Sequence, residues 1–542
     1  MKYYLELTDM KKAISMILCL LILFSAFGGL TAAAEDDENP TESTEAPSEP
    51  VQDPSVPTEA PTQAVEEPTQ NNEVVIPWQL DVPRVMIETE DKVGLSLKKA
   101  DGYVDATVKI IDTDGSEIGG SAQVKVRGNS TSGPAKKPYT VKFSKKLDVL
   151  GMGKAKKWAL LANMFDPTLL RNYLGIHTAA QMGLDYTSMQ QVVEVWMDGA
   201  FRGCYNLIEP VQEGSTRVDI DIESNGGKKD FLIEREYNRV EEDAVYFTTN
   251  GVRFVCDEPE SPDTEQLNYI KSTMDDIIAT MQSGNRREIE KKIDLDSFVR
   301  YYVMNEYIKP VDFDYSSVFF YYKDGKLYAG PAWDYDLSMG NEDAAASVKY
   351  ANGVKTDGVY CSNMHLYKWL SGYDWFFDKA RSVYLEYKSY FENFSEDGGL
   401  VDTLAQTYAG PFERNFSPSY ANWHVYAYYP NFNRKPDTSY AANLTYLKNW
   451  CAERSAWLTG YFTEDVTSYI LGDADEDNTL SVLDSTMIQR KIASISVDRF
   501  DATAADTDCD GTVTVFDATS IQRKLVDFDV PYTGDRVWIK SN

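Results

Sequence analysis

The stretch "VDFDYSSVFFYYKDGKLYAGPAWDYD", residues 311–336, places two pairs of carboxylates on either side of an apolar segment. Asp312 and Asp314 precede the segment, and Asp334 and Asp336 follow it. We predict that "FFYYKDGKLYAGP", between the two pairs, is a β-hairpin. Carboxylates among aromatic side chains lose hydration, so each pair needs a positive partner or a ligand. The candidates are an arginine of the fold, a metal ion and the reacting sugar of a hydrolase.

The segments around this stretch predict a mixed fold. Several of them alternate apolar and polar residues, as strands with one buried face do: "RVMIETE" from Arg84, "VGLSLKKA" from Val93, "DATVKIID" from Asp105 and "AQVKVRG" from Ala122. In "DPTLLRNYLGIHTAAQMG" we predict a helix with Asp166 as N-cap, Pro167 at the first position and Gly183 at the end. Further helices are predicted over residues 296–309 and much of 361–461. The expected fold class is α+β, in one large domain over residues 74–465.

The N-terminal residues predict export. Residues 1–34 contain a basic start, a long apolar run and small residues at its end, as a signal peptide does. The alternative is a membrane anchor, because the run is nearly long enough to span a bilayer. Residues 35–73 contain seven prolines, twelve acidic residues and no lysine or arginine, which predicts a disordered linker. We expect a secreted, extracellular protein without a membrane segment once the signal is cleaved.

Composition limits the function classes. The chain has 542 residues, 43% of them hydrophobic, which allows a large core and more than one domain. Its 53 basic and 85 acidic residues give a formal charge of -32, so it lacks the basic field of a nucleic-acid binder. The five cysteines after the signal are irregularly spaced, and the three histidines share no ligand spacing. Neither a disulfide framework nor a zinc site is predicted.

Two copies of one motif stand near the C-terminus. They are "GDADEDNTLSVLDSTMIQRKI" and "ADTDCDGTVTVFDATSIQRKL", in which Asp506 follows Asp473 by 33 positions (506 − 473). An EF-hand loop takes side-chain oxygens from positions 1, 3, 5 and 12 and a backbone oxygen from position 7. The copies supply Asp473, Asp475, Asp477, Thr479 and Asp484, and then Asp506, Asp508, Asp510, Thr512 and Asp517. Asn478 and Gly511 suit the sharp turn at position 6, so we predict two Ca²⁺ ions.

These repeats resemble a dockerin, the module that attaches cellulosomal proteins to cohesins of a scaffoldin. The resemblance rests on Asp at position 12 and on a single "IQRK" helix after each loop, and we place the domain at residues 466–531, with a tail at 532–542. It implies a small all-α module with two EF-hand-like loops, folding coupled to metal binding and a cohesin as partner. Loop positions 10 and 11 help to select the cohesin in many dockerins. Here they are Val482, Leu483, Val515 and Phe516, so the cohesin type stays open.

The large domain carries a series of short segments in a fixed order. They are "KVRGNST" with Arg127, "KKPYTVKF" with Lys142, "DPTLLRNYL" with Arg171, "GCYNLIE" with Glu209, the opening stretch, and "LSMGN". Together they resemble the CotH family of spore-coat-type proteins over about residues 80–460. The resemblance implies an atypical protein-kinase-like fold that binds ATP with Mg²⁺ or Mn²⁺. It also implies an atypical protein kinase that transfers phosphate to Ser or Thr of extracellular proteins.

The same resemblance assigns the site residues. Asp314 would be the catalytic-loop carboxylate, with Asp312 as a rival, and Asp334 the metal ligand, assisted by Asp336. The nucleotide-binding residues would be Arg127, Lys142, Arg171 and Glu209. Physical reasoning supports part of this, because ATP needs cations at its phosphates. The pleat places Lys142 on the face of its strand opposite Tyr139, Val141 and Phe143.

Several alternatives stay open. An active catalytic loop usually supplies an Asn soon after its Asp, and here Ser316 and Ser317 stand in that region, so a pseudokinase that only binds is one alternative. Lys142 as a solvated strand lysine, and Asp334 and Asp336 as partners of core arginines, are others. A polysaccharide-binding or polysaccharide-degrading component of the cellulosome is a further alternative, since "NWHVYAYYPNF" suits stacking on sugars. A glycoside hydrolase fits the sequence less well, because Asp334 and Asp336 on one strand would point to opposite faces and could not form a catalytic pair.

Overall fold

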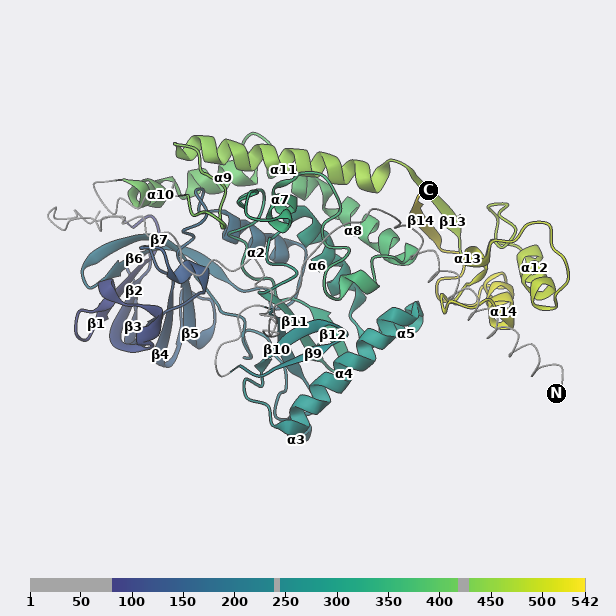
Figure 1. The fold of residues 1–542 in the computed structure, drawn as a ribbon, viewed down its shortest axis with the longest axis horizontal. Coiled ribbons are helices and arrows are strands. Elements are labelled where there is room, and N and C mark those ends of the chain that lie inside the picture. Colours follow the sequence, from purple (N-terminus) through teal and green to yellow (C-terminus); the bar gives the residue numbers. More distant parts are fainter. Residues whose placement is uncertain (1–79, 238–243, 418–427, 542) are drawn as a thin grey trace, which may run out of the picture. The chain divides into compact units, whose positions relative to one another are not determined.

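The computed structural model describes residues 80–237, 244–417 and 428–541, and begins with a closed β-barrel (Figure 1). The predicted signal peptide and linker lie outside these residues. The barrel strands are β1 (Arg84–Thr89), β2 (Val104–Ile111), β3 (Glu117–Val126), β4 (Tyr139–Asp148), β5 (Lys154–Leu161), β6 (Gln190–Met197) and β7 (Ala200–Ile208). They follow the order β1-β2-β3-β4-β5-β7-β6, and the parallel pair β1–β6 closes the ring. Val124, Val141 and Trp158 belong to the apolar core that fills the barrel.

A second, five-stranded sheet has the order β12-β11-β8-β10-β9. Its strands are β8 (Phe231–Arg235), β9 (Tyr246–Thr249), β10 (Val252–Glu258), β11 (Val318–Lys323) and β12 (Lys326–Ala329). The predicted hairpin is confirmed as β11–β12, which pair from Phe320 and Ala329 to Lys323 and Lys326. Its two turn residues, Asp324 and Gly325, have positive φ angles of 49° and 89°, as a tight turn between twisted strands requires.

Helices pack against this sheet and against barrel strand β7, and they form the largest core. They are α2 (Arg171–Gln181), α3 (Ser224–Gly227), α4 (Thr264–Ser283), α5 (Arg286–Lys292), α6 (Leu295–Ile308), α7 (Val348–Val354), α8 (Asp374–Glu392), α9 (Leu400–Thr407), α10 (Ala409–Phe416) and α11 (Tyr440–Thr463). Helix α6 contacts α2, α8 and α11 and is buried on nearly every side. The predicted α+β class is confirmed. Among the described residues, no helix is both long enough and apolar enough to cross a membrane.

Two local predictions differ from the structure. Residues 94–101 are not a strand but two 3₁₀ turns, Gly94–Ser96 and Lys99–Asp101. The side chains of Thr89 and Asp198 accept N–H groups at the start of the first turn, and Asp101 accepts the Lys98 N–H at the start of the second; such local bonds compete with strand pairing. Helix α2 begins at Arg171, later than predicted, because Asp166 accepts the Thr168 N–H and holds an intervening turn.

A small C-terminal domain follows α11. It contains α12 (Val482–Ile492), α13 (Ala502–Ala505) and α14 (Val515–Lys524), with a core that includes Ile488 and Ile521. Strand β13 (Val466–Ile470) leads into the domain and pairs antiparallel with β14 (Arg536–Lys540), which lies in the predicted tail. Strand β14 also contacts α8. Both ends of the small domain are thereby held together.

Candidate functional site

The loop after β12 carries Asp334 and Asp336, and a buried arginine holds it in place. Arg171, fully buried at the start of α2, donates from Nε to the Ser338 carbonyl at 3.0 Å and from an Nη to the Met339 carbonyl at 3.2 Å. Its other Nη pairs with Asp166 at 2.6 Å. Asp166 also accepts the backbone N–H of Arg171 at 2.7 Å. The predicted nucleotide-binding Arg171 thus anchors the acidic loop to α2.

Helix α2 fixes the same loop at a second point. The Asn172 side-chain oxygen accepts the Tyr335 N–H at 2.6 Å. The Tyr335 ring lies directly on Gly175, where a Cβ atom would come within 2.3 Å of the ring. Any larger side chain at Gly175 would therefore displace Tyr335, which stands between the two acids. The loop conformation depends on this close approach.

Asp312 and Asp334 meet in a small crevice. The crevice is lined by Tyr301, Asn305, Pro310, Asp312, Phe313, Ser316, Ser317, Val318, Trp333, Asp334 and Tyr335. Asp334 has a positive φ of 66°, a strained angle for a residue with a side chain, and it accepts a hydrogen bond from Ser317 Oγ at 3.2 Å. Asp312 forms a 3.4 Å ion pair with Lys349. The structure therefore brings one acid from each end of the hairpin into one site.

Asp336 lies deeper than Asp334. It is 7% exposed, and burial raises its pKa well above the ordinary value, with the nearby charges of Asp334, Asp166 and Asp312 acting in the same direction. A cation placed among these carboxylates would favour their charged forms. Asp336 thus belongs to the same acidic group, as a more enclosed member.

Asp314 is placed elsewhere. Its carboxylate accepts the His365 N–H at 2.9 Å, and it does not line the crevice that holds Asp312. Burial raises the pKa of Asp314, while hydrogen bonding from His365 and the charges of Arg235, Lys349 and Lys368 oppose that rise. The two acids diverge because Phe313 between them is buried against Tyr301 and His365. Of the two candidates for the catalytic-loop acid, Asp312 is the one beside Asp334.

A group of cations lies on the outer face of the barrel. Lys142 pairs with Lys157 across β4 and β5, and with Gln123 across β3 and β4, so these side chains share one face. Lys125, two residues after Gln123, lies on the same face, and both Lys125 and Lys142 approach the Tyr103 ring, at 4.9 and 5.8 Å. We call Lys125, Lys142 and Lys157 the lysine face. It is the kind of surface that polyphosphates bind.

The lysine face and the acidic loop are connected through Arg127. The Arg127 guanidinium lies over the Trp333 ring at 5.2 Å, immediately before Asp334 in the chain. Loss of hydration lowers the pKa of Lys157, and the charges of Lys125 and Arg127 lower it further, whereas Glu260 and Glu258 oppose them. Arg127 thus places a cation against Trp333, a residue that lines the crevice, while Glu258 and Glu260 are the acids close to Lys157.

A second set of acids lines the five-stranded sheet next to the crevice. Glu234 accepts the Ser317 N–H at 2.8 Å, and burial raises its pKa well above the ordinary value. Asp257 has its pKa raised to about 7 by burial, followed by the charge of Glu258, while Lys157 acts in the opposite direction. Sequence reasoning missed both acids and Lys157. The alternation of "DFLIERE" could have indicated Glu234, but only the sheet order brings it beside the hairpin.

Glu209 has a structural partner. It forms a 3.4 Å ion pair with Arg217 and accepts the Met189 N–H at 3.0 Å. Arg217 in turn donates to the Lys157 carbonyl at 2.6 Å and lies over the Trp158 ring. Through Arg217, Glu209 therefore supports the strand that carries Lys157; its own ion pair and hydrogen bond are with Arg217 and Met189, not with a side chain of the lysine face.

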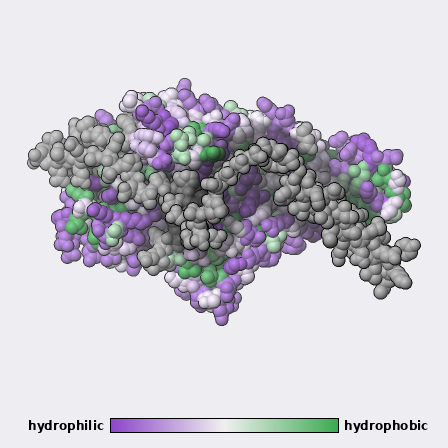
Figure 2. Space-filling view, in the orientation of Figure 1, coloured by the Kyte–Doolittle hydropathy of each residue, from purple (hydrophilic) through white to green (hydrophobic). Residues whose placement is uncertain are grey.

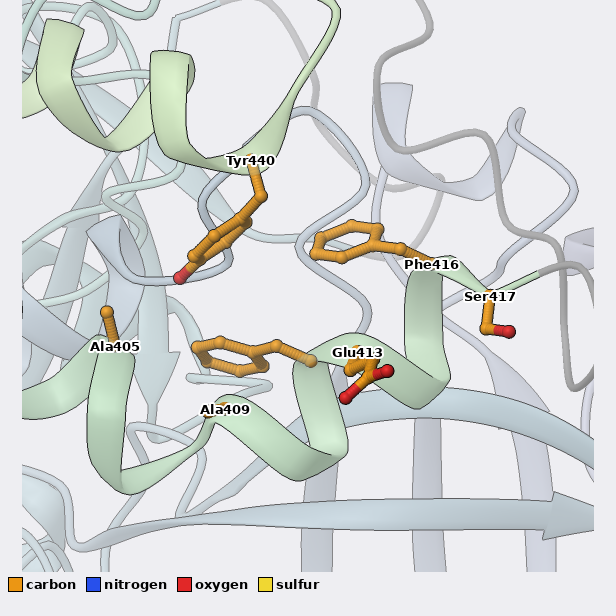
Figure 3. A pocket seen from close by; sticks show the side chains of 7 residues that line it. Ala405, Ala409, Glu413, Phe416, Ser417 and Tyr440 are labelled. Atoms are coloured by element: carbon orange, nitrogen blue, oxygen red, sulfur yellow. The ribbon is translucent and has the colours of Figure 1, made fainter.

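A second hollow is mainly apolar and shares no lining residue with the crevice. Its volume is about 370 Å³, and it is lined by Ala405, Ala409, Phe412, Glu413, Phe416, Ser417 and Tyr440. Figure 3 shows Phe416 and Tyr440 side by side at its wall, with Glu413 as the one charged side chain. The lining offers no cation for a phosphate. Most of the aromatic stretch considered for sugar stacking, residues 422–427, lies outside the described residues.

The two C-terminal loops form acidic clusters. Carboxylate oxygens of Asp473, Asp475 and Asp484, and of Asp506, Asp508 and Asp510, lie within 4.8 Å of one another in each cluster. Within the described residues, these two clusters are the only groups of three or more acids, histidines or cysteines with that spacing. Among the described residues, the large-domain crevice holds no group of that size and spacing.

The backbone shapes each loop around its first aspartate. Asp473 accepts the N–H groups of Asp477 and Asn478 at 3.0 and 2.8 Å. Asp506 likewise accepts from Asp510 and Gly511 at 3.1 and 2.8 Å. Asn478 and Gly511 have positive φ angles of 66° and 86°, as predicted for position 6.

The charge balance of the loops favours cation binding. Burial raises the pKa of Asp506 to about 6, hydrogen bonds from Gly511 and Asp510 oppose this, and the nearby Asp517 and Asp510 add to it. Asp508 has a buried carboxylate oxygen with no hydrogen-bond partner among the described residues. A hard divalent cation would supply the positive charge that these oxygens lack.

Comparison with known families agrees with this division of the chain. The family described as CotH kinase protein matches residues 124–458, and the dockerin type I domain matches residues 471–526. The order of the two families is the one predicted from the sequence. Dockerin type I domains are calcium-binding modules. A search of curated proteins gave no match.

Proposed function

Since the chain belongs to the CotH kinase protein family and carries a dockerin type I domain, we propose that it is a secreted, cellulosome-associated protein kinase. The large domain, with an atypical protein-kinase-like fold, binds ATP with Mg²⁺ or Mn²⁺ and transfers phosphate to Ser or Thr of extracellular proteins. The observation that carries this proposal is the crevice in which Asp312 and Asp334 meet, with Arg127 lying over the Trp333 ring at its wall.

The acids of the crevice suit a hard divalent cation. Asp334 lines the crevice and is partly exposed, whereas Asp336, two residues later, is nearly enclosed and does not line it; both offer carboxylate oxygens, the ligands that Mg²⁺ and Mn²⁺ prefer. Asp334 and Asp336 would hold the ion, and the nucleotide phosphates would complete its ligand set. When bound, the ion neutralises negative charge on the phosphates.

The lysine face and Arg127 bind the phosphates. Lys125, Lys142 and Lys157 present three ammonium groups on adjacent strands, and Arg127 extends this charge to the crevice through its contact with Trp333. Arg171 and Glu209, predicted to bind the nucleotide, act at one remove: Arg171 through the acidic loop and Glu209 through Arg217 and the Lys157 strand. Cations held on a barrel keep their positions during the reaction, which favours catalysis.

Asp312 orients the acceptor hydroxyl. In the transfer, the hydroxyl oxygen forms a bond to the γ-phosphorus, the bond from that phosphorus to the β–γ bridging oxygen breaks, and ADP leaves. The hydroxyl proton passes to the Asp312 carboxylate, which is 39% exposed and open to a substrate. The nearby Lys349 compensates the charge of Asp312. This assignment gives the role of the catalytic-loop carboxylate to Asp312 in place of Asp314.

The small domain anchors the enzyme to a scaffoldin. Two EF-hand-like loops each bind one Ca²⁺, and α12 and α14 face a cohesin. Positions 10 and 11 of the loops support this, because Val482, Leu483, Val515 and Phe516 are 59%, 59%, 55% and 71% exposed. Figure 2 shows hydrophobic side chains gathered on this domain. Exposed apolar residues in such a group are typical of an interface.

The kinase proposal is tested by transfer of label from [γ-³²P]ATP. The Ca²⁺-loaded full chain is incubated with Mg²⁺ or Mn²⁺ and a casein-like acceptor, in parallel with Asp312→Asn, Asp314→Asn and Asp334→Asn. We expect transfer by the wild type, loss of at least about 100-fold in Asp312→Asn and Asp334→Asn, and much smaller loss in Asp314→Asn.

Each other outcome has a defined meaning. Loss in Asp314→Asn with retention in Asp312→Asn would return the catalytic role to Asp314. Nucleotide binding without transfer would identify a binding pseudokinase. The absence of both transfer and binding would contradict the proposed function of the large domain, while release of soluble sugar would favour a polysaccharide-degrading enzyme.

A further inference from the structure

We propose that the side-chain oxygen of Asn305 is a ligand of the divalent cation in the crevice, together with Asp334. This inference rests on the proposed function, because it assumes that the crevice holds the cation that accompanies the nucleotide. It assigns to helix α6 the neutral oxygen that the loop after Asp312 lacks, where Ser316 and Ser317 stand.

The orientation of the Asn305 amide is set by one hydrogen bond. Its Nδ2 donates to the Tyr301 carbonyl one turn earlier on α6, at 2.7 Å. The flipped orientation would place two oxygen atoms against each other at that distance, so it is excluded. The Asn305 Oδ1 therefore points away from the Tyr301 carbonyl.

Asn305 Oδ1 is buried without a partner. The residue is 0% exposed, and this oxygen has no hydrogen-bond partner among the described residues. A buried polar atom left in this state destabilises the fold, and such atoms in proteins are typically satisfied by water, an ion or a substrate. Leucine would fill a similar volume without that penalty. The amide is thus better explained by a ligand than by packing.

The crevice has room for one such ligand. Asn305 lines the crevice together with Asp312, Ser317 and Asp334. The free volume of the crevice is about 10 Å³. That space fits one water-sized body, and a divalent cation is smaller than a water molecule. Carboxylate, amide carbonyl and hydroxyl oxygens are the donors that Mg²⁺ and Mn²⁺ take. Asn305 belongs to helix α6, whereas Asp334 belongs to the loop after β12, so the two lining residues come from different elements.

The test measures Mn²⁺ binding and does not depend on catalysis. Full chain with its dockerin loops saturated with Ca²⁺ is titrated with Mn²⁺ in the presence of ADP, and free Mn²⁺ is measured by electron paramagnetic resonance. Asn305→Leu is expected to weaken Mn²⁺ binding by about tenfold or more. Its melting temperature without Mn²⁺ should equal or exceed that of the wild type, because the change removes an unsatisfied polar atom.

A matched control separates binding from folding. Asn415 is also fully buried and also has one amide atom, Nδ2, without a partner among the described residues, but its Oδ1 accepts the Cys204 N–H at 2.9 Å and the residue does not line the crevice. Asn415→Leu should lower the melting temperature and leave Mn²⁺ affinity unchanged. In Asn305→Asp, a protonated carboxyl donates to the Tyr301 carbonyl in place of Nδ2 and keeps its other oxygen at the position of Oδ1, so this variant should bind Mn²⁺ as tightly as the wild type.

The outcomes distinguish this inference from the proposed function. Unchanged Mn²⁺ affinity in Asn305→Leu, while Asp334→Asn loses it, would overturn the Asn305 assignment and leave the cation site intact. If Asn305→Leu does not fold, weaker binding by Asn305→Asp would overturn the assignment, and equal or tighter binding would support it. If the wild type shows no Mn²⁺ binding that depends on Asp334, both proposals fail.

Discussion

Replacing Arg171 by methionine should destabilise the large domain and loosen the acidic loop. Arg171 and Asp166 form an ion pair whose side chains are 1% and 0% exposed. Removing one partner of a buried pair typically costs about 3–5 kcal/mol, because the other charge is left without compensation. Asp166 keeps the N–H groups of Thr168 and Arg171 as donors, which places the expected loss near the lower end, about 3 kcal/mol.

The corresponding change in melting temperature is measurable. Unfolding entropy is about 2.1 cal/mol/K per residue, so a domain of roughly 380 residues has about 0.8 kcal/mol/K. A loss of about 3 kcal/mol then lowers the melting temperature by about 4 °C. Calorimetry of the Ca²⁺-loaded full chain measures this shift. The double variant Arg171→Met with Asp166→Asn should recover part of it, because no carboxylate is left stranded.

The same variant should also weaken nucleotide-dependent Mn²⁺ binding. The Arg171 guanidinium holds the carbonyls of Ser338 and Met339, directly after the loop that carries Asp334 and Asp336. A melting temperature within about 1 °C of the wild type, or no recovery in the double variant, would refute the assignment of Arg171 as the buried anchor of the loop.

Four further results are expected. With EDTA present, the small domain should unfold at a lower temperature than the large one, and a single thermal transition insensitive to EDTA would contradict this. Native mass spectrometry should show that Asp506→Ala binds one Ca²⁺ ion where the wild type binds two. Burial lowers the pKa of Lys136 from 10.5 to about 7, so protonation of this lysine destabilises the fold by an amount that grows as pH falls from about 10.5 and is complete near pH 7. The melting temperature of wild type relative to Lys136→Met should therefore rise from pH 7 to about pH 10, and a constant difference would exclude this linkage. Lys157→Gln should weaken ATP binding in equilibrium dialysis, and the loss should be smaller at high salt than at low salt. Equal ATP affinity of the variant and the wild type would show that the lysine face is not part of the nucleotide site. Arg454→Met should lower the melting temperature by several degrees, because Glu306 would lose its buried partner at 3.1 Å; no shift would show that the pair adds nothing.

Local signals in the sequence were sufficient for the hairpin and for the two acidic loops. A two-residue "DG" turn between apolar runs determines β11–β12, and the spacing of acids within twelve residues determines each loop. Both features depend on neighbours in the chain, so one sequence contains the whole pattern.

The barrel and the partner of each acid could not be predicted in the same way. Closure of the barrel requires β1 to pair with β6, which follows it by about a hundred residues, and no local pattern encodes that register. Asp312 and Asp314 are equivalent as a sequence pattern. They differ because the His365 N–H, supplied from a distant loop, binds Asp314 and leaves Asp312 beside Asp334.

Strand alternation gave Lys142 the right face but missed the residues around it. Gln123 and Lys157 join Lys142 only through the pairing of three strands. Asn305 was missed for a similar reason, because a helical asparagine among apolar residues gives no signal until the fold places it at the crevice with an unpartnered oxygen. Such sites arise from the packing of elements that are far apart in the chain.

The central claim is that a nucleotide binds between the lysine face and the crevice of Asp312 and Asp334. Isothermal titration of the Ca²⁺-loaded full chain with ATP, in the presence of Mn²⁺, tests it most directly. We predict one bound ATP per chain in the wild type and loss of binding in both Asp334→Asn and the Lys142→Glu, Lys157→Glu double variant. Absence of ATP binding by the folded wild type, or equal binding by these variants, would contradict the account.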